Sequence, residues 1–98
     1  MIVSCHRSKK SYLRMRGKVD VIDAQILKLI AQRMNVVRKL SLQKQKYRVP
    51  VRDRARENYL KYLWKIRAEQ LGLNKRFAVR ILNEVLTMSK QVQGEVRK

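Results

Sequence analysis

The stretch IAQRMNVVRKLSLQK, residues 30–44, decides the fold because it contains no helix breaker and repeats apolar residues every three or four positions. One face of the predicted helix carries Val37 and Leu40. The same face carries two cations, Arg33 and Lys44, which are 11 residues apart and point within about 20° of each other. Because their backbone positions are about 16 Å apart along the axis, both long side chains can converge on one small anion.

The helical pattern extends upstream of this stretch to about Ser11, and only Gly17 weakens it, by about 1 kcal/mol. It ends near Tyr47, since Pro50 disfavours the helical conformation in the residue before it. Such a helix is about 50 Å long, so we expect a second chain to lie against it. Its apolar row consists of Met15, Val19, Ile22, Ile26, Leu29, Ile30, Val37 and Leu40.

Two shorter helices follow. Asp53 is a good N-cap for a helix over residues 54–71, and Gly72 is typical of a helix C-terminus. Asn74 caps a third helix that runs to about Val96. The apolar row of the third helix consists of Phe77 or Ala78, Ile81, Leu82, Val85, Leu86, Met88 and Val92. The sequence therefore predicts an all-α fold with one very long N-terminal helix and two shorter helices.

The composition favours a single helical domain that binds anions. The chain has 98 residues, 3 glycines, 1 proline and a net charge of +18, which attracts nucleic acid, acidic membrane surfaces or small polyanions. The single cysteine, Cys5, excludes an intrachain disulfide and is consistent with a reducing cytoplasm. The apolar run at the N-terminus is too short for a signal peptide or a membrane span, so we expect a cytoplasmic protein.

Three further polar residues lie on faces that are otherwise apolar. They are Glu57 near the start of the second helix and Ser89 and Gln93 on the third. Lysine and arginine often lie at the edge of a core with the charge in water, which is the simple alternative. A cluster from three helices is better explained by a ligand, because one carboxylate cannot neutralise several buried cations. The missing partner is then a small anion.

Four segments are found together in one known family. They are MRGKVDVIDAQILKLIAQRM at 15–34, Lys44, VPVRDRARE at 49–57 and MSKQVQ at 88–93. In order and spacing they resemble the all-helical chorismate mutases. The resemblance covers about residues 13–94, so we expect a chorismate mutase type II helical domain over 13–98 after a basic N-terminal extension over 1–12.

The resemblance implies an intertwined homodimer with two shared active sites. It implies an isomerase that rearranges chorismate to prephenate, at the branch of the shikimate pathway towards phenylalanine and tyrosine. The reaction is unimolecular, so it needs electrostatic preorganisation rather than a nucleophile. The resemblance implies no cofactor and no metal.

It also implies roles for individual residues. Lys44 and Gln93 are expected to stabilise the ether oxygen of the breaking bond, and Lys44 also meets a carboxylate. Arg33 and Ser89 are expected to bind a substrate carboxylate, while Arg16 reaches another from the partner chain. Arg16 and Lys44 are 28 residues apart, about 42 Å along one helix, so they cannot contact the same small molecule within one chain.

Near the start of the second helix, Asp53 and Glu57 are expected to bind the ring hydroxyl, Asp53 through its backbone, and Arg56 to line or support the site. Cys5 and His6 stand alone and do not indicate a metal site.

Three alternatives stay open. An isochorismate-pyruvate lyase of the same fold would use a similar cationic pocket. A basic helical protein that binds nucleic acid would explain the charge, although no helix-turn-helix or zinc-ligand spacing is present. A mutase could also depend on another enzyme of the shikimate pathway as its partner.

Overall fold

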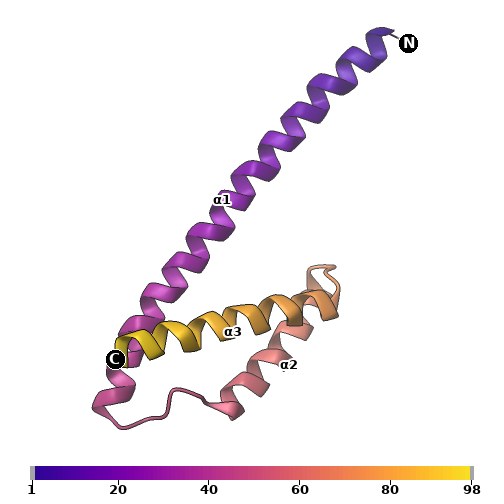
Figure 1. Ribbon diagram of the computed structural model, residues 1–98. Coiled ribbons are helices and arrows are strands. Elements are labelled where there is room, and N and C mark those ends of the chain that lie inside the picture. The colour runs from indigo at the N-terminus through magenta and orange to yellow at the C-terminus, as the bar shows by residue number, and fades with distance from the viewer. Residues whose placement is uncertain (1, 98) are drawn as a thin grey trace. The chain divides into compact units, whose positions relative to one another are not determined.

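Residues 2–97 form three α-helices: α1 (Ile2–Lys46), α2 (Arg54–Gln70) and α3 (Lys75–Arg97) (Figure 1). The structure, a computed structural model, describes residues 2–97 and the side chains of residues 9–95. No strand occurs within residues 2–97. The predicted all-α fold with a long first helix is therefore confirmed. The chain divides into two compact units, residues 1–32 and 33–98.

The first helix is longer than predicted. It begins at Ile2, whereas the pattern placed its start at about Ser11. The basic residues in between carry no helix breaker, so the helix continues through them.

A left-handed residue ends α1. Arg48 has φ 56°, and the N–H of Val49 donates to the carbonyl of Lys44 at 2.7 Å. These features match a Schellman-type C-cap, usually occupied by glycine. The cap closes the last helical turn and fixes the backbone that carries the Lys44 side chain.

Side-chain and glycine caps define the hairpin of α2 and α3. The Asp53 carboxylate accepts from the N–H of Arg56 at 3.0 Å, and the Asn74 amide oxygen accepts from the N–H of Phe77 at 3.0 Å. Both predicted N-caps are thereby confirmed. Gly72 adopts φ 72° at the tight turn, which glycine accommodates without a steric cost.

The core of the second unit joins the end of α1 to α3. Met34, Val37 and Val92 are buried together, and Val85 packs against them. Leu82 is fully buried on the same helix as Val92.

In the second unit, the buried face of α1 is rotated from the predicted row, and Met34, which was not part of that row, is buried. Ser41 is fully buried, whereas Leu40 is 48% exposed. The face that packs therefore follows positions 34, 37 and 41. The Ser41 hydroxyl donates to the carbonyl of Gln93 at 3.4 Å, which satisfies its buried oxygen. On α3, Ala78 is buried and Phe77 is exposed.

The first unit has an unpaired apolar face. Its large apolar side chains are exposed in the single chain, although residues of these types are usually buried in globular domains. The exposed apolar residues of this segment are Leu13, Met15, Val19, Val21, Ile22, Ile26, Leu27, Leu29 and Ile30.

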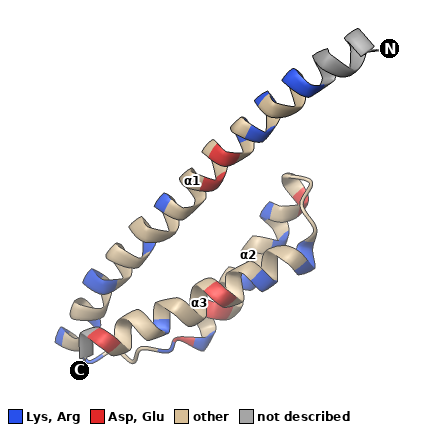
Figure 2. Ribbon diagram, turned by 45° about the horizontal axis from the view of Figure 1, so that its top comes forward, with Lys and Arg blue, Asp and Glu red and all other residues tan. Residues whose placement is uncertain are grey.

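Basic residues occur on all three helices (Figure 2). Within the described residues, no helix is long and apolar enough to cross a bilayer.

Candidate active site

A charged cavity of about 150 Å³ lies within the second unit, lined by the end of α1, the loop before α2, the first part of α2, and α3. It brings together seven of the eight predicted site residues. Those seven are Arg33, Lys44, Asp53, Arg56, Glu57, Ser89 and Gln93. The eighth, Arg16, lies in the first unit, is exposed and does not line this cavity.

Arg33 and Ser89 form one polar pair of the cavity. Arg33 is half-buried on α1 and donates through Nη1 to the hydroxyl oxygen of Ser89 on α3. The Ser89 hydroxyl in turn donates to the carbonyl of Val85 at 2.8 Å. Burial lowers the pKa of the Arg33 guanidinium, and repulsion from the Arg56 charge lowers it further. A bound anion would relieve both effects.

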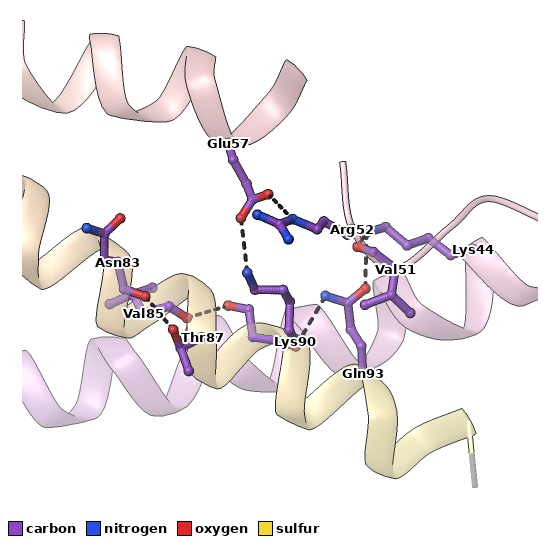
Figure 3. Close-up of polar contacts among 10 residues, drawn as sticks. Lys44, Val51, Arg52, Glu57, Asn83, Val85, Thr87, Lys90 and Gln93 are labelled. Atoms are coloured by element: carbon purple, nitrogen blue, oxygen red, sulfur yellow. Dashed lines mark hydrogen bonds and ion pairs between the residues drawn. The ribbon is translucent and has the colours of Figure 1, made fainter. Parts of the chain in front are cut away.

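Lys44 and Gln93 form the second pair. The Lys44 ammonium donates to the amide oxygen of Gln93 at 3.0 Å and to the carbonyl of Val51 at 2.9 Å (Figure 3). The Gln93 amide nitrogen donates to the carbonyl of Ser89 at 3.2 Å. Gln93 is 5% exposed, so its amide is held in one orientation. Two N–H-bearing groups are thus fixed side by side within the lining of the cavity.

The start of α2 supplies the carboxylates. Asp53 is the N-cap, and its carbonyl also accepts from the N–H of Glu57 at 3.0 Å, in the first turn of the helix. The side chain of Glu57 therefore leaves the helix where the backbone is held by two capping interactions. Asp53 and Arg56 are exposed, while Glu57 is half-buried.

Two cations that the sequence analysis left out contact Glu57. One carboxylate oxygen lies 3.2 Å from Nε of Arg52, and the other lies 3.2 Å from the ammonium of Lys90 (Figure 3). Burial alone raises the pKa of Glu57, but the hydrogen bonds and charges of Lys90 and Arg52 outweigh burial and hold it below its usual value. One signal was present in the sequence: Lys90 follows Leu86 by four residues and so lies on the same face of α3.

The net positive charge of the cavity lining suits the binding of a small dianion. Its cations are Arg33, Lys44, Arg52, Arg56 and Lys90, and its carboxylates are Asp53 and Glu57. This leaves an excess of three positive charges. The described residues that line the cavity include no Cys or His. The Ser89 hydroxyl contacts a guanidinium and a carbonyl but no general base, so the arrangement favours electrostatic stabilisation over nucleophilic attack.

A second cavity, of about 280 Å³, lies at the other end of the α2–α3 hairpin. It is lined mainly by apolar side chains, among them Trp64, Leu71, Leu73 and Phe77, and its single charged residue is Arg67. It therefore lacks the groups that bind a dianion. Among the described residues, no cluster of three or more His, Cys, Asp or Glu side chains could hold a metal ion.

A family model described as chorismate mutase type II matches residues 15–94 of the chain. The match contains all eight predicted site residues and parts of all three helices. Comparisons with curated proteins and with solved structures gave no match.

Proposed function

We infer, because the chain belongs to the chorismate mutase type II family, that its charged cavity is where chorismate rearranges to prephenate. The family consists of isomerases that act on chorismate, in the part of the shikimate pathway that leads to aromatic amino acids. Chorismate carries two carboxylates, which suits a cavity with an excess of three positive charges.

The observation that carries this proposal is the pairing of Lys44 with Gln93. In the rearrangement the carbon–oxygen bond lengthens before the new carbon–carbon bond forms, so negative charge grows on the ether oxygen. The ammonium lies 3.0 Å from the Gln93 amide oxygen, so the amide nitrogen of the same side chain is close by, and we propose that both groups donate to that ether oxygen. The second proton of the Gln93 amide nitrogen has no acceptor among the described residues, so it is available to the substrate. Preorganised donors of this kind contribute about 3–4 kcal/mol each.

The remaining residues bind and orient the substrate. We propose that Arg33, held by Ser89, binds one carboxylate and that Arg56 supports the same edge of the cavity. Glu57 and the backbone of Asp53 accept and donate hydrogen bonds at the ring hydroxyl. Holding the two ends of chorismate selects the compact conformer from which the bond can form. No step needs a covalent intermediate.

We further propose that two copies of the chain form a homodimer and share their sites. The exposed apolar row of residues 13–30 supports this, because a second copy would bury it. Arg16 belongs to the same segment, and an antiparallel pairing of two α1 helices would bring it to the other copy's cavity. It would then bind the second carboxylate.

Two broader expectations remain proposals. We propose that residues 1–12 form an extension to a domain over 13–98, since the family match begins at residue 15. A cytoplasmic location is supported by the single cysteine of the sequence. Dependence on another shikimate-pathway enzyme, and nucleic-acid binding through the +18 charge, have no specific support in the described residues.

Product analysis separates the mutase from the lyase. Purified protein given chorismate is expected to form prephenate, measured as phenylpyruvate after acid treatment. Given isochorismate under the same conditions, it is expected to release little pyruvate. Pyruvate release from isochorismate that is faster than prephenate formation would assign the cavity to the lyase reaction instead.

A further inference from the structure

The Glu57 carboxylate is held from two sides by cations that come from different parts of the second unit. Arg52, in the loop before α2, contacts Oε2, and Lys90, on α3, contacts Oε1 (Figure 3). The Glu57 side chain is 15% exposed. Both oxygens therefore have an ionic partner, and the orientation of the carboxylate is set by residues outside its own helix.

The two cations do not contribute equally. The side chain of Lys90 is 37% exposed and that of Arg52 is 57% exposed. Water and salt screen an exposed pair more than a partly buried one, so the contact with Lys90 should be the stronger. Lys90 also comes from α3, the helix that carries Ser89 and Gln93.

We propose that Lys90 is a positioning residue for the rearrangement: its 3.2 Å contact holds the Glu57 carboxylate in the orientation in which it accepts a hydrogen bond from the substrate hydroxyl. The proposal rests on the proposed function. Lys90, on α3, would act through the Glu57 side chain and would not contact the reacting atoms.

A lysine on a helix surface is ordinarily solvated, and Lys75 is an example of this on α3. Lys75 pairs with Glu69 at 3.3 Å, but both side chains are more than half exposed. Lys90 instead lines the cavity and contacts a carboxylate whose pKa burial alone would raise. The other charged groups around the cavity are Arg33, Lys44, Arg52, Asp53 and Arg56.

The direction in which pH changes the stability of the folded chain follows from the direction in which the pKa of Glu57 is shifted. Because the folded chain lowers the pKa of Glu57, the ionised carboxylate contributes stability at neutral pH that is lost as pH falls through that pKa. Lys90→Met removes the main opposing cation and leaves the burial. The pKa of Glu57 should then rise towards or above its usual value, because burial is no longer opposed by the Lys90 charge.

The test is an NMR titration of the Glu57 side-chain carboxyl in the full-length chain, assigned with Glu57→Gln, together with the pH profile of kcat/KM for chorismate. Lys90→Met should move the Glu57 titration and the acid limb of the profile to higher pH by the same amount. Lys90→Arg, which keeps the charge, should restore both towards wild type. Lys75→Met, which removes a lysine–glutamate pair from the same helix away from the cavity, should change neither.

Two results would overturn the proposal: an unchanged Glu57 titration in Lys90→Met, with the helix content intact by circular dichroism, or a shifted titration with an unmoved acid limb. Absence of chorismate turnover by the wild-type chain would overturn the proposed function and the positioning role with it. That failure is distinguishable, because the titration still reports whether Lys90 holds Glu57.

Discussion

Replacing Lys44 with alanine is expected to lower kcat/KM for chorismate by about 10³-fold or more, at the limit of detectable turnover. The ammonium that contacts Gln93 and Val51 would be lost, and with it both a donor to the ether oxygen and a charge for a carboxylate. Helix content should not change, because Lys44 lies in the capped last turn of α1 rather than in the core. Steady-state rates and circular dichroism measure the two quantities.

The matched control is Lys39→Ala. Lys39 lies on the same helix and carries the same charge, but it is exposed and does not line the cavity. Its removal should leave kcat/KM within about twofold of wild type at physiological salt, since a distant surface charge is screened. A near-normal rate in Lys44→Ala, with the control also normal, would refute the role of Lys44.

The second large effect concerns two chains that are each inactive. Arg16→Ala and Lys44→Ala should both lack turnover alone, yet mixing them should restore about a quarter of wild-type activity. In a mixed dimer, one site keeps the Lys44 of one chain and the Arg16 of the other. Half of randomly paired dimers are mixed, and one of the two sites in each is intact.

The control for this experiment is a mixture of Lys44→Ala and Gln93→Ala chains. Both residues line the cavity of the same chain, so every site in a mixed dimer carries one defect. This mixture should stay inactive. Mass spectrometry of differently tagged chains verifies that subunits have exchanged. Continued inactivity of the Arg16→Ala and Lys44→Ala mixture after verified exchange would exclude a shared site.

Periodicity was sufficient to predict that the main polar residues of the cavity lie on the packed faces of their helices. A helix places residues three and four apart on one face, so cations at 33 and 44 within an apolar row had to lie along the packed side of α1. The same rule put Ser89 and Gln93 on the packed side of α3. The structure brings these faces together, as Arg33 with Ser89 and Lys44 with Gln93.

Other features depend on how the helices pack, which periodicity does not fix. The rotation of α1 about its axis buries Ser41 rather than Leu40. Adjacent residues of a helix point about 100° apart, and the sequence pattern does not decide which of the two faces the core. The contact between Lys90 and Glu57 joins residues 33 positions apart on two helices. The spacing from Leu86 places Lys90 on the packed face of α3, but its carboxylate partner follows only from the packing of α3 near the start of α2.

The exposed apolar row of residues 13–30 shows a third limit of prediction from the sequence. The sequence pattern identifies an apolar face but not what covers it, and in the single chain that face is open. The prediction of a dimer therefore depends on the length of the helix and on the cost of leaving apolar side chains in water.

The most direct test of the central claim, that the cationic cavity rearranges chorismate, is the loss of chorismate absorbance in the presence of the purified full-length chain. We predict a rate that is proportional to protein concentration, saturates with chorismate and yields one prephenate for each chorismate consumed. Decay at the uncatalysed rate, with the protein folded and helical by circular dichroism, would contradict the account.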